Sequence, residues 1–256
     1  MISENMRFGF WPNPRSDYES TKILAQHAEA TGWDGIWLAD HFLPEEDALI
    51  PVHESWVTMA ALARDVPRVR LGTLVTGNTY RHPAVLANIA STLDNLADGR
   101  VVLGLGAGWQ QNKHDAYGIE YGTVGSRLDR LEEACQVIKG LFHTDHFSFS
   151  GQHYQLKNAP LEPKPLQAKI PLMIGGGGEK RTLNIAAQYA DEWNVWGDVK
   201  ILKNKMAILD QHCESIGRDP QEIEKSAVAL LFLSDNESFL KKCEPLISLH
   251  QPLSGT

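Results

Sequence analysis

Short apolar runs alternate with longer amphipathic stretches along the chain, and this pattern predicts the structural elements. The runs have the length of buried strands, whereas the stretches between them carry apolar residues at helical spacing. The predicted strands are residues 7–11, 35–38, 70–75, 101–105, 170–174, 193–196 and 226–233. Strands that alternate with helices predict a parallel α/β fold. Seven such strands favour a (β/α)8 TIM barrel over an open doubly wound sheet.

The predicted helices begin at recognisable signals. Ser16 and Glu19 have the spacing of a capping box, and the helix that they open ends at Gly32. Pro83 opens a helix that extends to Leu96. The other predicted helices are residues 56–64, 126–142, 183–187 and 199–216. Each predicted helix therefore follows a predicted strand, as a barrel requires.

Two segments interrupt this rhythm. Residues 143–169 contain alternating apolar positions around Ser150 and Gly151, which predict a small hairpin inserted into the barrel. After Leu233 only 23 residues remain, with a helix-like stretch at 239–249 but no clear eighth strand. We therefore expect a single barrel domain over residues 1–256 whose last β/α unit is incomplete.

Composition and charge narrow the class of protein. The net charge is −8 and 22% of the residues are charged, so no attraction to nucleic acid or to an anionic membrane is expected. No apolar run has membrane-spanning length, and the first residues lack the apolar region of a secretory signal. Cys135, Cys213 and Cys243 lie far apart, without disulfide or metal spacing. This usage favours reduced thiols in the cytoplasm.

Candidate chemistry follows the ends of the predicted strands, because ligands of a barrel bind at the carboxyl ends of its strands. Asp40 and His41 follow the second strand and place a carboxylate beside a group that titrates near neutral pH. Thr76 and Asn78 follow the third strand and can hydrogen-bond a ligand, while Gly77 allows close backbone approach. Ordinary polar turn chemistry is the alternative for both segments.

Glycine-rich segments follow the fourth and fifth predicted strands. Residues 104–109 read Gly-Leu-Gly-Ala-Gly-Trp and leave room for a flat ring beside Trp109, although close packing explains these glycines almost as well. The glycine run at residues 175–178 precedes a predicted helix, so converging backbone N–H groups predict phosphate binding. The run lacks the Gly-Lys-Ser/Thr ending of a P-loop. The sequence shows neither metal-ligand spacing nor a serine hydrolase elbow.

Together these segments resemble the bacterial luciferase-like monooxygenase superfamily, particularly its F420-dependent oxidoreductases. The resemblance covers about residues 6–197 and rests on the order and spacing of several motifs. These motifs are residues 37–42, 81–84, 92–94, 99–100, 104–109, 163–165, 171–176 and 190–194. The resemblance implies a TIM barrel that holds the tricyclic ring of a deazaflavin at the carboxyl ends of its strands.

The resemblance also implies roles for individual residues. Asp40 would hydrogen-bond the ring system, and His41 would handle the proton that accompanies hydride transfer, with Trp109 as a third candidate catalytic residue. A non-prolyl cis peptide bond would fall near Leu74 and Val75. The implied cofactor-binding residues are Asp40, Leu74, Val75, Thr76, Gly77, Asn78, Gly106, Ala107, Gly108 and Trp109 at the ring, and Gly175, Gly176, Gly177 and Gly178 at the phosphate.

The resulting hypothesis is an oxidoreductase that transfers a hydride between coenzyme F420 and a small organic substrate, with a homodimer implied by the resemblance. The first alternative is an FMN-dependent monooxygenase that uses reduced flavin and O₂. The second is a flavin-binding barrel without catalysis. It is motivated by the incomplete last unit and by residues 110–114 (Gln-Gln-Asn-Lys-His), which lack the acids that the family often carries there. No residue indicates one particular substrate.

Overall fold

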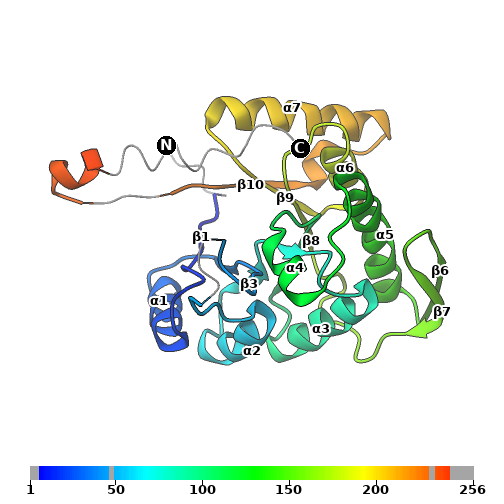
Figure 1. The fold of residues 1–256 in the computed structure, drawn as a ribbon, viewed down its shortest axis with the longest axis horizontal. Helices are drawn as coiled ribbons and strands as arrows, with labels where there is room; N and C mark the ends of the chain where they lie inside the picture. The colour runs from blue at the N-terminus through cyan, green and yellow to red at the C-terminus, as the bar shows by residue number, and fades with distance from the viewer. Residues whose placement is uncertain (1–5, 46–48, 231–233, 243–256) are drawn as a thin grey trace. The chain divides into compact units, whose positions relative to one another are not determined.

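The computed structural model describes residues 6–45, 49–230 and 234–242 (Figure 1). The chain forms two compact units, Met1–Met173 and Ile174–Thr256. Each unit contains parallel strands joined by helices, which confirms the predicted alternation. The expected single domain over residues 1–256 stays a prediction.

The first unit contains a parallel sheet whose neighbouring strands follow one another along the chain. β1 (Gly9–Phe10) pairs with β2 (Gly35–Leu38), β2 pairs with β3 (Arg70–Thr73), and β3 pairs with β5 (Val101–Gly106). The short β4 (Thr76–Gly77) also pairs with β5. All six residues of β5 are buried, as expected for a strand covered on both faces. Because these strands are parallel, their carboxyl ends meet at one edge of the sheet.

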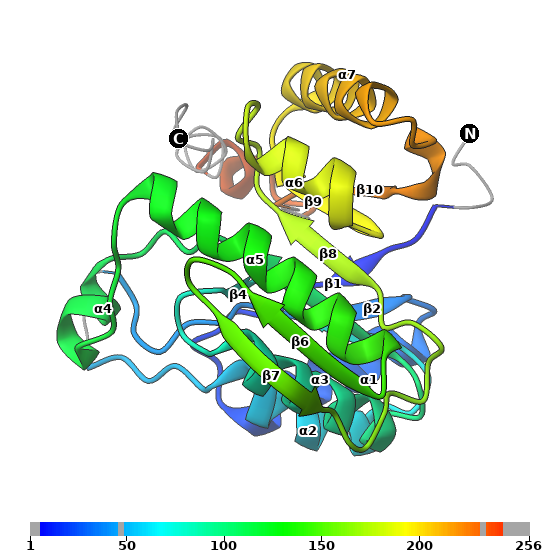
Figure 2. The same cartoon turned by 90° about the vertical axis from the view of Figure 1, so that its right-hand side faces the viewer.

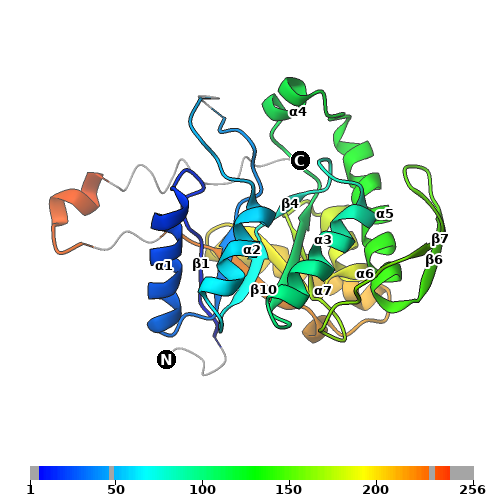
Figure 3. The same cartoon turned by 90° about the horizontal axis from the view of Figure 1, so that it is seen from below.

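Amphipathic helices follow these strands. They are α1 (Tyr18–Ala30), α2 (Ser55–Asp65), α3 (Pro83–Leu96) and α5 (Val124–His143). Figure 3 shows α1, α2 and α3 side by side, and each contacts the next. α3 buries Leu86, Ala90 and Leu93 on one face. Burying a leucine side chain stabilises a fold by about 1.5–3 kcal/mol, so the apolar face holds such a helix in place.

The starts of two helices differ from the prediction. α1 is capped by Asp17, whose carboxylate accepts a hydrogen bond from the Ser20 N–H at 2.8 Å, so the predicted Ser16 cap is wrong. α5 is capped by Thr123, whose hydroxyl accepts from the Ser126 N–H at 3.1 Å. Ser16 and Asp17 both precede α1, and Thr123 and Ser126 both lie at the start of α5, so the entering backbone decides which side chain faces the free N–H groups.

The segment after α5 forms the predicted hairpin. β6 (His146–Ser150) and β7 (Gln155–Pro160) pair antiparallel and lie beside α5 (Figure 2). The carboxylate of Glu133, on α5, accepts hydrogen bonds from the backbone N–H groups of residues 152–154 at 2.7–3.0 Å. The helix therefore anchors the turn of the hairpin.

The short helix α4 (Asn112–Tyr117) was not predicted. It ends at Gly118, whose φ of 67° lies in the left-handed region that favours glycine. Its buried side chains are Lys113 and His114 rather than apolar residues. A helix without an apolar stripe gives no periodic signal, which explains why the hydrophobic pattern missed it.

The second unit continues the alternation of strands and helices. β8 (Leu172–Gly175) leads into it and is followed by α6 (Thr182–Tyr189), β9 (Glu192–Trp196), α7 (Val199–Ser215), the 3₁₀ turn η1 (Pro220–Glu222) and β10 (Glu224–Val228). β9 and β10 are parallel, with Asn194 opposite Ser226. α6 packs on α7.

The end of the chain was predicted less well. β10 begins at Glu224, before the predicted start at 226, and residues 231–233 lie outside the described residues. Of the predicted helix at 239–249, the described part ends at residue 242, and residues 237–242 are helical. Within the described stretch 234–242, no strand follows β10.

Candidate functional site

The carboxyl ends of β2, β4 and β5 bring several predicted site residues together in the first unit. Asp40 and His41 follow β2, Asn78 follows β4, and Trp109 follows β5. The rings of His41 and Trp109 meet edge to face, with centroids 5.9 Å apart. Residues that are distant in the sequence are thus neighbours at this edge, as parallel strands require.

Asp40 is buried, and both of its carboxylate oxygens accept hydrogen bonds. Arg81 donates to them at 2.6 and 3.1 Å, and the Ser55 hydroxyl donates at 2.8 Å. The same guanidinium also pairs with the carboxylate of Glu54. These bonds hold the start of the loop that carries His41, and a direct contact of Asp40 with a cofactor stays a prediction.

His41 is held at its Nδ1 atom by two side chains that were not predicted. Nδ1 lies 2.6 Å from Gln110 Oε1 and 2.8 Å from Lys113 Nζ. Burial and then the charge of Lys113 lower the pKa of His41 below its ordinary value, so the ring is neutral at pH 7. Its Nε2 atom makes no hydrogen bond within the part of the chain that the structure describes.

Lys113 is fully buried on α4. Its ammonium lies 4.8 Å from the centroid of the Tyr80 ring, within the range of a cation–π contact. Burial lowers the pKa of Lys113 to about 8, although the Asp40 charge acts in the opposite direction. The only signal for this residue in the sequence was the absence of acids at residues 110–114.

A second buried histidine, His114, lies on α4 and connects the loops that follow β4 and β5. His114 is fully buried, and its Nδ1 lies 2.8 Å from the Gln110 carbonyl oxygen. Nδ1 must carry the proton to make this bond, so Nε2 accepts a hydrogen bond from the Thr79 hydroxyl at 2.6 Å. Burial lowers the pKa of His114. This satisfied, neutral histidine positions α4.

The segment before α3 holds the residues predicted around the cofactor ring. The peptide bond between Leu74 and Val75 is cis, as the resemblance implied. Thr76 uses its hydroxyl inside the protein, because it accepts from Trp56 Nε1 at 3.0 Å and donates to Thr73 Oγ1 at 2.9 Å. Both hydrogen bonds of the Thr76 hydroxyl are therefore made to buried side chains of the protein.

Asn78 differs from Thr76 in having a free hydrogen-bonding atom. Its Nδ2 donates to the Tyr154 hydroxyl at 3.3 Å. Its Oδ1 is buried and accepts no hydrogen bond from the residues that the structure describes. A buried acceptor without a donor is costly, so this oxygen fits a site that a ligand N–H completes.

The glycine segment after β5 leaves backbone close to the neighbouring loop. Gly108 has a φ of 83°, and a Cβ there would lie 2.9 Å from Thr79 Oγ1. Trp109 follows with 61% of its surface exposed, which is high for so large an apolar ring. Its carbonyl oxygen accepts a hydrogen bond from Tyr121 at 2.6 Å. Its position gives the site edge an exposed aromatic wall next to His41.

The second unit contains the predicted phosphate loop. Gly176 has a φ of 127°, its N–H donates to the Asn194 carbonyl at 3.0 Å, and its carbonyl accepts from Trp193 Nε1 at 2.9 Å. The N–H groups of Gly177 and Gly178 have no partner among the described residues. No side chain caps the N-terminus of α6, which follows. These free N–H groups are those that an anion would use.

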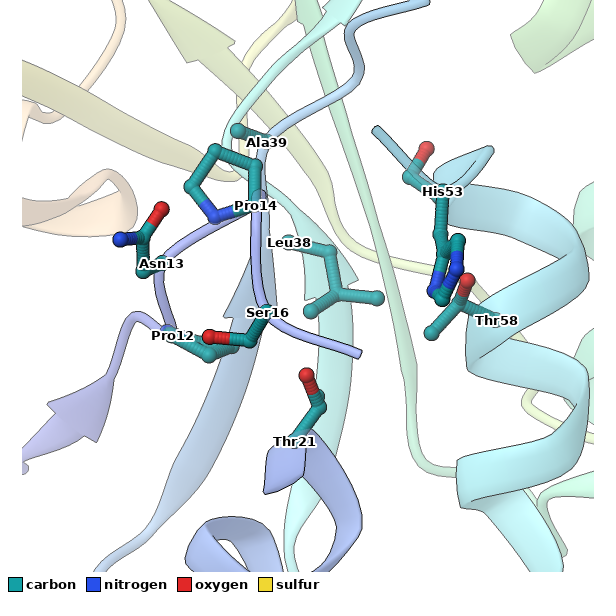
Figure 4. A pocket seen from close by; sticks show the side chains of 10 residues that line it. Pro12, Asn13, Pro14, Ser16, Thr21, Leu38, Ala39, His53 and Thr58 are labelled. Carbon is teal, nitrogen blue, oxygen red and sulfur yellow. The ribbon is translucent and has the colours of Figure 1, made fainter. Parts of the chain in front are cut away.

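A small pocket of the first unit lies between residues 12–16 and the start of α2 (Figure 4). His53 and Thr58 face this loop across the pocket, and Leu38 and Ala39 also line it. None of the residues predicted to bind the cofactor lines it. The pocket adjoins the site edge, because Ser55, which lines it, donates to the Asp40 carboxylate at 2.8 Å.

The described residues hold no group of three or more His, Cys, Asp or Glu side chains that could bind a metal ion. Within the same residues, no helix is long and apolar enough to cross a membrane. Cys135 and Cys213 are buried and free, and Cys243 lies outside the described residues.

Comparison with known proteins assigns the chain to a family. A family model described as luciferase-like monooxygenase matches residues 5–247. The chain belongs to the luciferase-like monooxygenase family. The resemblance inferred from the motifs is thereby confirmed, and it extends beyond the residues 6–197 on which it was based.

Two curated proteins are similar to this luciferase-like chain. The F420-dependent glucose-6-phosphate dehydrogenase of Amycolatopsis mediterranei (strain U-32) is 36% identical over 169 residues, which are 65% of this chain and 48% of that protein. The F420-dependent hydroxymycolic acid dehydrogenase of Mycobacterium tuberculosis (strain ATCC 25618 / H37Rv) is 31% identical over 219 residues, 84% of this chain and 59% of that protein. The chain thus spans about half the length of these relatives.

Similarity to a solved structure confirms the predicted fold. It is an F420-dependent secondary alcohol dehydrogenase in complex with an F420-acetone adduct, and it matches with a TM-score of 0.80 and 27% identity. The match covers 86% of this chain and 68% of that chain. The (β/α)8 TIM-barrel class is therefore the fold of this luciferase-like protein, and no strand follows β10 within the described residues.

Proposed function

We propose that this chain is an oxidoreductase that transfers a hydride between coenzyme F420 and a small organic substrate. The observation that carries the proposal is the contact of His41 with Trp109 at the strand ends of one unit, where Asn78 also has a buried oxygen without a donor among the described residues. The names of the relatives support the choice of F420, since all three proteins compared above are named as F420-dependent.

The residues present fit a deazaflavin ring. Asn78 Oδ1 is a buried acceptor that needs a donor, and a deazaflavin presents a ring N–H of this kind. Gly106 and Ala107 add little side-chain bulk beside it, and the exposed Trp109 offers an aromatic surface against which a flat ring can pack. We assign these residues to the ring, together with Leu74, Val75 and Gly77 of the adjoining segment.

The glycine run fits the cofactor phosphate. Two free backbone N–H groups, at Gly177 and Gly178, precede a helix whose N-terminus has no side-chain cap. The partial positive charge of the helix N-terminus favours an anion there. Glu179 is paired with Lys205 at 2.8 Å, which offsets its repulsion of a phosphate. We therefore assign the phosphate to the run that begins at Gly175.

His41 can accept or donate the proton whose transfer accompanies that of the hydride. When a hydride leaves the carbon of an alcohol, the hydroxyl proton must leave as well, and the reverse reaction needs a proton donor. A bound F420 would accept or supply the hydride. Because its pKa is lowered and its Nε2 has no partner among the described residues, neutral His41 can offer that nitrogen to a substrate.

The cofactor assignment is tested by titrating the protein with F420 and with FMN in parallel. Quenching of the F420 fluorescence at micromolar concentration, with weaker binding of FMN, is expected. Tight binding of FMN without measurable binding of F420 would reject the proposal in favour of an FMN-dependent monooxygenase. Binding of F420 without reduction by any alcohol in a broad panel would favour the non-catalytic barrel.

The proposal also covers the oligomeric state and the cellular compartment of the protein. We infer a second copy of the chain as partner from the resemblance, and the cytoplasm from the separated, free cysteines. Sedimentation equilibrium of the purified protein tests the first inference, and a monomer at all concentrations would reject it.

A further inference from the structure

Gln110 and Lys113 place opposite demands on one nitrogen of His41. Gln110 Oε1 lies 2.6 Å from Nδ1, and Lys113 Nζ lies 2.8 Å from the same atom. A neutral ring nitrogen carries either a proton or a lone pair, so it either donates or accepts. The amide oxygen requires the proton, whereas a lysine ammonium requires the lone pair.

Gln110 cannot remove this conflict by turning its amide over. Its Nε2 donates to the Leu43 carbonyl at 3.0 Å and to Asn112 Oδ1 at 2.7 Å. Asn112 is fixed in turn, because its Nδ2 donates to the Pro44 carbonyl at 2.9 Å. A flipped Gln110 would place its oxygen against two acceptors. Oε1 therefore remains toward His41.

We propose that the protonation state of Lys113 selects the tautomer of His41 and so decides what His41 Nε2 offers a substrate. With Lys113 charged, Nδ1 accepts from the ammonium, and the ring proton lies on Nε2, which can donate. With Lys113 neutral, the Nδ1–H donates to Gln110, and Nε2 presents a lone pair. Lys113 is a positioning residue that acts through His41. The use of Nε2 rests on the proposed function, but the tautomer does not.

The surroundings of Lys113 make both of its states accessible near neutral pH. It is fully buried, and this burial lowers its pKa to about 8. The charged and titratable side chains around the pair include Asp40 with its partner Arg81, Tyr80 and His114. Asp40 favours the charged lysine, but its own charge is shared with Arg81. Lys113 therefore changes charge close to the pH at which enzymes work, whereas His41 stays neutral.

The test follows the ring nitrogens of His41 by ¹⁵N NMR in the full, cofactor-free chain from pH 6.5 to 9.5. The resonances are assigned by their loss in His41→Ala. In the wild type, the proton is expected on Nε2 below about pH 8 and on Nδ1 above it. In Lys113→Met, which has a side chain of similar length but no charge, the proton is expected on Nδ1 throughout. Lys157→Met removes an exposed lysine of β7 and is expected to behave like the wild type.

One tautomer throughout the wild-type titration would overturn the proposal, and this measurement needs no variant. The same switch in Lys113→Met as in the wild type would overturn it too. The kinetic arm measures kcat/KM for alcohol oxidation against pH. In the wild type, kcat/KM is expected to rise with pH near 8. In Lys113→Met, this rise is expected to be absent. A tautomer switch in a protein that does not bind F420 would support the role of Lys113 and reject the proposed function, so the two failures are separable.

Discussion

The guanidinium of Arg81 donates to both carboxylate oxygens of Asp40, at 2.6 and 3.1 Å. The Asp40 side chain has no exposed surface, and that of Arg81 is 12% exposed. This pair fixes the residue immediately before His41, so it links the stability of the first unit to the geometry of the candidate site.

Removing Arg81 is expected to destabilise the protein strongly. Arg81→Met should lower the free energy of unfolding by about 3–5 kcal/mol, because a buried carboxylate would lose its partner. Urea denaturation measures this loss. Lys22→Met is the control, since Lys22 pairs with Glu19 at 2.6 Å on the surface of α1 and should matter little. Equal losses in the two variants would contradict a buried pair at Asp40.

Replacing His41 is expected to reduce turnover and leave cofactor affinity nearly unchanged. In His41→Ala, kcat should fall about 10²- to 10⁴-fold, the usual contribution of a general acid or base. Stopped-flow reduction of F420 measures the rate, and fluorescence titration measures the affinity. His27→Ala, on the exposed side of α1, is the control. Unchanged turnover with every accepted substrate would remove His41 from the mechanism.

Gly176 is expected to tolerate no side chain. Its φ of 127° is strained for any residue with a Cβ, so Gly176→Ala should lower the free energy of unfolding by about 1–3 kcal/mol. Gly177→Ala is the matched control, because its φ lies outside the left-handed region and its Cβ would only approach Val195 Cγ2 at 3.0 Å. Thermal denaturation compares them, and a larger loss in Gly177→Ala would contradict the backbone argument.

Lys113 is expected to make stability depend on pH. The unfolded chain holds the lysine proton up to its ordinary pKa of 10.5, whereas the folded protein releases it near pH 8. Between these values the unfolded state binds more protons, so stability contributed by this site rises with pH. Between pH 8 and 10, the free energy of unfolding of the wild type should rise relative to that of Lys113→Met by at most about 1.4 kcal/mol per pH unit.

Urea denaturation at pH 7.5, 8.5 and 9.5 measures that difference. At pH 7.5 Lys113→Met should be the more stable protein, because a buried ammonium is replaced by an apolar side chain of similar length. Lys157→Met should show no such trend with pH. A constant difference between the wild type and Lys113→Met across this range would show that Lys113 keeps its proton in the folded state.

Most strands and the long helices could be predicted from the sequence, because each depends on a local period of apolar residues. β5 and α3 illustrate this, since their buried faces are continuous in the sequence pattern. The cis bond at Leu74 and Val75 was implied by the family resemblance, and the structure contains it. The cap of α1 was misplaced from Asp17 to Ser16, since capping depends on the backbone path before the helix.

The candidate site was predictable only in part. By itself the sequence determined that Asp40, His41, Asn78 and Trp109 follow the ends of parallel strands, because neighbouring parallel strands end at one edge. Only the tertiary structure decided what surrounds them. Lys113 lies 72 residues from His41, and lysine is seldom buried, so no local pattern could pair the two. The docking of α4, which has no apolar stripe, brings that ammonium to Nδ1.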